Sequence, residues 1–217
     1  MCDYKIFQIG FNKCGTWSIH ALFEGYAKIK SVHWQGGLIA KSIMDNMNSS
    51  ADLLPGFGDV RVFTDMECCF LKNGLCEWFF AFKHFELLDK RYPGSKFILN
   101  TRNLDGWLKS RFNHPCGHAI DEDGQFISVN PKPYWERMAS WMGRAIGRDL
   151  LEEEVKETWI REREDHHGRV MEYFKNRPGD LLVFDLDNDP FEKFRNFFPD
   201  IDFATDKMPI LNNTLHK

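Results

Sequence analysis

Short apolar runs alternate along the chain with longer segments in which apolar residues recur at every third or fourth position. The first run covers residues 4–9, and residues 15–27 have the spacing of an amphipathic helix. Further strands are predicted at 30–34, 60–65, 96–102 and 180–186. Further helices are predicted at 36–47, 75–92, 104–112, roughly 133–148, 152–176 and 190–198, with a polar loop at 114–133.

This order of elements indicates the fold class. Strands that alternate with helices form a parallel sheet with helices on both faces, which is a three-layer α/β architecture. No repeat, low-complexity tract or linker divides the chain, so we expect a single domain over residues 1–217. Residues from about 112 to 176 interrupt the alternation. We expect them to form a helical cap over the sheet edge at which ligands bind.

The segment between the first strand and the first helix has the form of an anion-binding loop. Gly10 and Gly15 bound it, and it lies between a strand and a helix as in P-loop NTPases. Backbone N–H groups in such a loop, together with the helix N-terminus, attract phosphate-like groups. Lys13 adds a positive charge, and Thr16 and Ser18 add hydroxyl donors. We therefore expect a P-loop NTPase-like fold, although a turn without a ligand has the same local pattern.

The lysine of this loop is misplaced for a nucleotide triphosphatase. In the pattern G-x-x-x-x-G-K-[ST] the lysine follows the second glycine, whereas here Thr16 and Trp17 follow Gly15. The sequence also shows no obvious partner carboxylate for Mg²⁺. These departures argue against hydrolysis of ATP or GTP and favour a different diphosphate-like or phosphosulfate ligand.

A second candidate anion site follows a later strand. Arg102 stands at the end of a predicted strand, and Ser110 lies eight residues further on, in the next predicted helix. An arginine fork and a serine hydroxyl can converge on one phosphate group. If the sheet is parallel, this site and the glycine loop lie at the same edge, where a ligand with two anionic groups can span them.

With these two sites, the chain resembles the PAPS-dependent sulfotransferases, whose donor is 3′-phosphoadenosine 5′-phosphosulfate (PAPS), and in particular their smaller bacterial-type members. "FNKCGTWS" is similar to the 5′-phosphosulfate loop of that family, usually K-x-G-T-[TS]-S. "RNLDGWLKS" is similar to its 3′-phosphate motif. The likeness extends through residues 86–110 and 161–186 and so covers most of the chain, with gaps in the acceptor region.

The resemblance implies roles for the residues of both motifs. Lys13 would contact the phosphosulfate, and Arg102 with Ser110 would hold the 3′-phosphate. The residues expected to bind the donor are Asn12, Lys13, Cys14, Gly15, Thr16, Trp17, Ser18, Arg102 and Ser110. Trp17 departs from the family, whose members often carry Thr or Ser there. The tail lacks the basic Gly-rich loop that larger members use on the 3′-phosphate.

The reaction implied is in-line transfer of a sulfuryl group to an acceptor, which leaves 3′,5′-adenosine bisphosphate and requires no metal. Lys13 would neutralise the charge that develops on the leaving group. The acceptor must lose a proton, and a positioned base contributes roughly 100- to 10,000-fold to such a step. Asp65, at the end of a predicted strand, is the expected base, with Glu67 and His33 as alternatives.

The acceptor is expected to be a small molecule or a sugar that reacts through an alcohol, phenol, sugar hydroxyl or amine group. Its expected contacts are His33, Trp34 and His166. His166 matches a histidine common in similar sequences, and a packing role in the predicted long helix is the alternative reading.

Composition and charge bear on the partners, the location and the metal content of the protein. The net charge of −4 gives no overall basic field for nucleic acid or an acidic membrane. No signal peptide and no apolar run long enough to span a bilayer are evident, which predicts a cytoplasmic protein. Six cysteines without a CxxC pair favour reduced thiols, and Cys116 with His118 makes only a weak metal motif, so no metal is expected.

Two other functions fit parts of this pattern. A P-loop kinase of small molecules would need Mg²⁺ ligands and a lysine after Gly15. A non-catalytic relative would keep the nucleotide site without the chemistry.

Overall fold

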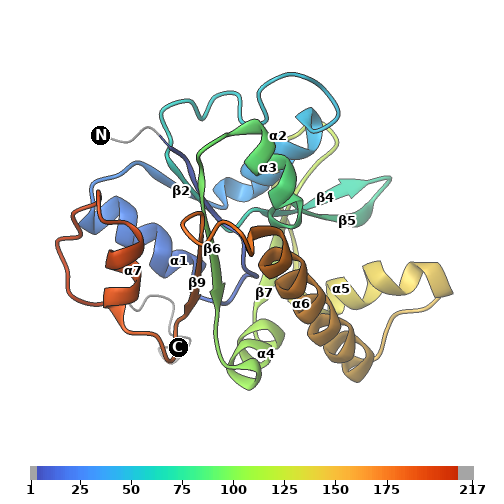
Figure 1. Ribbon diagram of the computed structural model, residues 1–217. Coiled ribbons are helices and arrows are strands. Elements are labelled where there is room, and N and C mark those ends of the chain that lie inside the picture. The colour runs from blue at the N-terminus through green and yellow to red at the C-terminus, as the bar shows by residue number, and fades with distance from the viewer. Residues whose placement is uncertain (1–3, 210–217) are drawn as a thin grey trace.

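The computed structural model describes residues 4–209, which form a three-layer α/β fold (Figure 1). Its central sheet has five parallel strands in the order β2-β3-β1-β6-β9. The bounds of these strands, in that order, are Ser31–His33, Val62–Thr64, Ile6–Gln8, Lys96–Thr101 and Leu181–Asp185. The predicted α/β class with a parallel sheet is confirmed. β1 is the middle strand, so the loop that follows it lies at the centre of the sheet edge.

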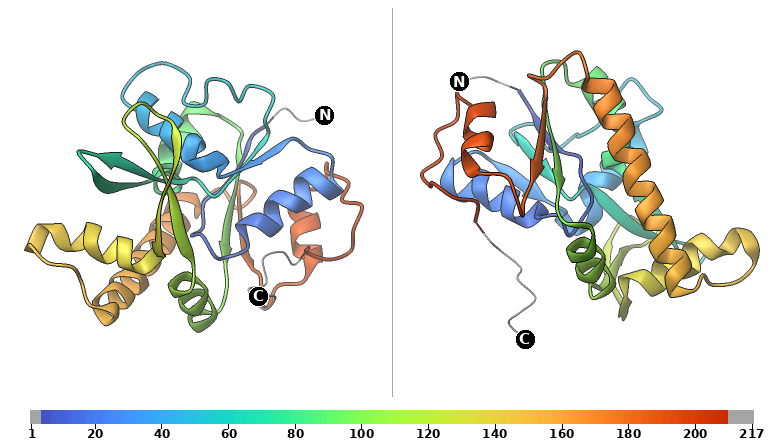
Figure 2. Two further views of the ribbon diagram at one scale, coloured as in Figure 1. Left: turned by 180° about the vertical axis from the view of Figure 1, so that it is seen from behind. Right: turned by 60° about the horizontal axis from the view of Figure 1, so that its bottom comes forward.

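The two faces of the sheet are buried by different helices because side chains alternate along each strand. Ile6 packs in a cluster with α1 and α7, which are Thr16–Ala21 and Phe191–Phe197. Its neighbour Phe7 packs in a second cluster with α3 and α6, which are Phe85–Arg91 and Glu152–Phe174. Figure 2 shows α1 and α7 together on one side of the sheet and α6 on the other.

A second, four-stranded sheet has the order β5-β4-β7-β8 and lies beside the first. Its strands are β4 Glu67–Lys72, β5 Leu75–Phe80, β7 Pro115–Ile120 and β8 Phe126–Pro133. The predicted helix over 75–92 is therefore wrong in its first half, and the predicted loop over 114–133 is wrong because it forms the β7–β8 hairpin. Asn73 and Gly74 both have positive φ between β4 and β5, which is the conformation of a two-residue hairpin turn.

The remaining helices follow the predictions more closely. α2 spans Leu38–Asn46, α4 spans Leu104–Phe112 and α5 spans Tyr134–Gly143. The side chain of Asn103 caps α4, since its Oδ1 accepts from the N–H of Gly106 at 3.2 Å. Within residues 4–209, no helix combines the length and the apolar character needed to cross a bilayer.

Candidate functional site

The glycine loop (residues 10–15) follows β1 and is fastened to β6 by one side chain. Asn100 accepts from the N–H of Gly10 through Oδ1 at 3.1 Å and donates to the carbonyl of Cys14 through Nδ2 at 2.7 Å. A Cβ at Gly10 would stand 2.2 Å from the carbonyl oxygen of Asn100, so this position requires glycine. Gly15 has a φ of 78° and is packed against Leu186. The loop is thus fastened at both of its ends.

The two predicted anion sites meet at this edge of the sheet. Arg102 follows the last residue of β6, and its Nη1 lies 3.5 Å from the carbonyl oxygen of Lys13. Its Nη2 lies 3.5 Å from Asp187 Oδ1, which is a long ion pair between half-buried groups. Burial lowers the pKa of Lys13, and Asp65 and Glu67 oppose this shift. The site therefore holds two cations from different strand ends with acidic groups beside them.

These residues line one cavity of about 570 Å³. Its walls come from the glycine loop, α1 and α4 on one side, and from β4, β7 and the start of α5 on the other. The predicted site residues that line it are Asn12, Lys13, Gly15, Thr16, Trp17, Ser18, His33, Trp34, Asp65, Glu67, Arg102 and Ser110.

Two predicted site residues do not line the cavity. Cys14 is buried, and burial raises the pKa of its thiol to about 12, so its contribution is the backbone bond to Asn100. His166 is also buried, where its Nε2 donates to the carbonyl of Ile9 at 2.7 Å. Phe11 packs edge-on to its ring at 5.5 Å. His166 has the environment of a packing residue that braces the start of the glycine loop, and we do not place it at the acceptor.

Two carboxyl groups lie together in the cavity wall. Asp65 occupies the corner between β3 and β4 with a φ of 56°, and its N–H donates to Gln8 Oε1 at 2.9 Å. Glu67 begins β4 and accepts from Asn12 Nδ2 at 2.7 Å. Burial, and then the charge of Glu67, raise the pKa of Asp65 well above its usual range. Burial also raises the pKa of Glu67. A carboxyl group with a raised pKa is a stronger base once it is ionised.

His33 stands next to Asp65. Its Nδ1 lies 2.9 Å from the hydroxyl oxygen of Thr64, and its Nε2 lies 3.4 Å from Asp65 Oδ2. Burial lowers the pKa of His33 to about 3, which keeps the imidazole neutral near pH 7.

A fully buried arginine lies behind the carboxyl pair, and the sequence did not reveal it. The guanidinium of Arg111 lies over the rings of Trp159 at 4.2 Å and Tyr134 at 5.1 Å, and it donates to the Tyr134 hydroxyl at 3.2 Å. Its charge lowers the pKa values of both Asp65 and Glu67, against the effect of their burial. Arg111 is one residue past the predicted motif, and only its place on a buried helix face could have signalled its role.

A comparison with known protein families matches residues 5–203 to the sulfotransferase domain. The chain belongs to the sulfotransferase domain family. The predicted enzyme class, a PAPS-dependent sulfotransferase, is thereby confirmed, and sulfuryl transfer is preferred over phosphoryl transfer by a kinase. No curated protein is a significant match to this sulfotransferase. Within residues 4–209, no group of three His, Cys, Asp or Glu side chains is arranged to hold a metal ion.

Proposed function

We propose that this sulfotransferase binds PAPS between the glycine loop and Arg102 and moves its sulfuryl group to a neutral acceptor. The observation that supports this most strongly is the approach of Arg102 to the backbone of Lys13 in the wall of one cavity. Two anion-binding elements from separate strands are thereby adjacent. A donor with one anionic group at each end of a nucleoside fits that arrangement.

The residues present fit the donor chemically. Gly10 allows the loop to pack directly on Asn100, because any side chain there would collide with that residue. Lys13 and Thr16 would hold the 5′ phosphosulfate, and Arg102 with Ser110 would hold the 3′-phosphate. When bound, PAPS supplies the activated sulfuryl group. Among residues 4–209, no group accepts a hydrogen bond from the buried Nε of Arg102, so the guanidinium retains donor capacity for a phosphate.

The protein's own contribution is positioning, charge stabilisation and proton removal. Lys13 is held by a left-handed backbone with a φ of 63° at the cavity wall, where its ammonium can offset negative charge on a leaving phosphate. Asp65 is the base we propose for the acceptor proton, since burial and Glu67 together raise its pKa. Glu67 is fixed by Asn12 and remains the first alternative, and His33 is the second.

The walls away from the glycine loop indicate the kind of acceptor. Trp34 lies edge-on to the ring of His118 at 6.1 Å, and Trp78 packs against Tyr134 at 4.9 Å. Burial lowers the pKa of His114 to about 4, so this group is neutral near pH 7. The charged residues among the described lining are Lys13, Asp65, Glu67, Arg102 and Asp187. We therefore propose a neutral acceptor with a flat or apolar body and a reactive hydroxyl or amine.

The five described cysteines, Cys14, Cys68, Cys69, Cys76 and Cys116, are free thiols, while Cys2 lies outside the described residues. Free thiols persist in a reducing compartment, which supports the proposed cytoplasmic location.

Calorimetry with 3′,5′-adenosine bisphosphate, followed by turnover with labelled PAPS over a panel of acceptors, tests the proposal. We expect micromolar binding, and turnover of neutral phenols or apolar alcohols in preference to anionic sugars. Asp65→Asn should lower turnover by roughly 100- to 10,000-fold and leave binding unchanged. Arg148→Ala, a change at an exposed arginine that does not line the cavity, is the matched control and should alter neither. A folded protein that does not bind the bisphosphate would disprove the donor site.

A further inference from the structure

The four-stranded sheet carries a pair of thiols that the proposed chemistry does not use. Cys69 on β4 is paired with Trp78 of β5, and Cys76 on β5 is paired with Leu71 of β4. The two cysteines are therefore diagonal neighbours on the same face of the β4–β5 hairpin. The two thiols shift each other's pKa in opposite directions. Diagonal neighbours on one face of a hairpin are close enough for their side chains to meet.

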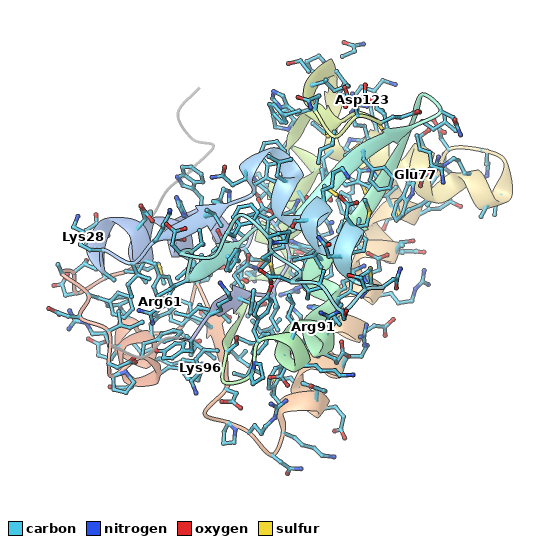
Figure 3. The ribbon with its side chains drawn as sticks, turned by 90° about the horizontal axis from the view of Figure 1, so that it is seen from above. Lys28, Arg61, Glu77, Arg91, Lys96 and Asp123 are labelled. Carbon is cyan, nitrogen blue, oxygen red and sulfur yellow. The ribbon has the colours of Figure 1, made fainter. Side chains whose placement is uncertain are left out.

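Two arginine side chains contact Cys76. Arg137 of α5 donates to Cys76 Sγ through Nη1 at 3.3 Å. Arg144, which follows α5, donates to the Cys76 carbonyl at 2.7 Å and is paired with Glu77 at 2.8 Å. Figure 3 shows Glu77 where the hairpin meets α5. Cys76 is therefore held between a thiol donor and a guanidinium group.

This environment gives Cys76 a lower pKa than the neighbouring thiols have. The hydrogen bond from Cys69, followed by the charge of Arg137, lowers the pKa of Cys76 to about 6 although burial opposes the shift. The same hydrogen bond, together with burial, raises the pKa of Cys69. Burial raises the pKa of Cys116, on β7, to about 11. Cys76 is therefore the most readily ionised of these three thiols.

Cys76 opens on a second cavity of about 460 Å³, separate in its lining from the first. Lys132, Arg137 and Arg144 contribute three cations to its wall, and Glu136 and Asp149 contribute two acids. Trp135 and Trp141 also line it. Cys69, in contrast, lines the first cavity. The two sulfur atoms therefore stand between the two cavities, with the reactive one facing the more basic space.

We propose that Cys76 is a site of thiol–disulfide exchange with a small disulfide that carries carboxylate groups, and that Cys69 is its resolving thiol. The Cys76 thiolate attacks one sulfur of the small disulfide, whose S–S bond breaks and releases one thiolate that takes up a proton. Cys69 then loses its proton, attacks Cys76 Sγ and displaces the second small thiol. In sum, two cysteine sulfurs are oxidised to a Cys69–Cys76 disulfide, and one small disulfide is reduced to two thiols.

This site goes beyond the proposed sulfuryl transfer and can be tested without PAPS. The whole chain is treated with oxidised glutathione and followed by intact mass and peptide mapping. The parent protein should end with a Cys69–Cys76 disulfide, and Cys69→Ser should stop at a glutathione adduct on Cys76. Cys116→Ser is the matched control and should behave like the parent. Cystamine, a cationic disulfide of similar reactivity, should react more slowly because three cations line the cavity.

A second measurement needs no variant. Thiolate fractions at pH 7, corrected for the lower nucleophilicity of a more acidic thiol, predict that Cys76 is alkylated by iodoacetamide roughly 30 to 100 times faster than Cys116. Its rate should show a midpoint near pH 6, set by Cys69, Arg137 and Arg144 together. Adducts on Cys116 before Cys76, a midpoint near that of an ordinary thiol, or equal rates with both disulfides would overturn the proposal.

Discussion

Arg102 provides the most discriminating test of the donor site, because its removal should affect one phosphate and little else. Its Nη2 is 3.5 Å from Asp187, and both side chains are about one-third exposed. An ion pair of that kind contributes roughly 0–1 kcal/mol to folding. The change Arg102→Ala should therefore lower the melting temperature by no more than about 2–4 °C in a domain of this size.

The effect on binding should be much larger. A hydrogen bond from a guanidinium group to a phosphate contributes roughly 1.5–3 kcal/mol, because at least one partner is charged. Its loss corresponds to an increase in Kd of about 10- to 150-fold. Arg102→Lys keeps the charge but not the planar fork, so it should recover only part of the affinity.

Calorimetry with two ligands shows whether this loss is specific. Adenosine 3′,5′-bisphosphate carries both phosphates, and adenosine 5′-monophosphate lacks the one that Arg102 is proposed to bind. The parent protein should prefer the bisphosphate, and Arg102→Ala should abolish that preference while binding the monophosphate as before. If the variant weakens both ligands equally, Arg102 does not contact the 3′-phosphate and the orientation of the donor is wrong.

Three further variants test the site. Gly10→Ala should destabilise the protein and weaken bisphosphate binding, because its Cβ would stand 2.2 Å from a backbone oxygen. Gly58→Ala, with open space around it, is the control. Equal melting temperatures for the two variants would contradict the close packing at Gly10. Asp65→Asn should lower kcat by roughly 100- to 10,000-fold. A buried acid with a raised pKa lowers the stability of the folded protein as pH rises from its unfolded pKa through its folded pKa. Asp65→Asn should therefore raise the melting temperature at pH 8 but not at pH 3. An unchanged melting temperature at pH 8 would show that burial does not raise the pKa of this carboxyl group. Arg111→Met should raise the pKa of Glu67, measured by carbon NMR of the carboxyl group, and an unchanged value would remove Arg111 from the electrostatics of the site.

The sequence was most informative where one local pattern determines the structure. The strand, glycine loop and helix at the N-terminus are contiguous, and the parallel sheet that places Arg102 beside them follows from the alternation of elements. The same local reading failed at residues 75–80, where the apolar spacing also suits a helix. Asn73-Gly74 was the available signal for a hairpin, since both residues accept positive φ.

The residues that complete the site depend on contacts distant in sequence. The charge of Arg111 acts on the carboxyl pair from a site that long-range packing builds, because α5 and α6 bring Tyr134 and Trp159 around its guanidinium. For His166 the sequence suggested a role that the structure does not support. Its match to a position of the family suggested a contact with the substrate, whereas its ring donates to the backbone of Ile9. A motif identifies residue types, but burial and hydrogen-bond partners decide between a reacting group and a supporting one.

The short connection between the two sheets has a consequence for how this enzyme can diversify. β3 ends at Thr64 and β4 begins at Glu67, so only Asp65 and Met66 join the sheet of the glycine loop to the sheet that walls the other half of the cavity. The hairpins that follow this connection can be exchanged or lengthened to suit a new acceptor. The proposed base would keep its position relative to the proposed nucleotide site. Loop grafting onto the ends of β5, β7 and β8 is accordingly the natural route to redesign selectivity in this scaffold.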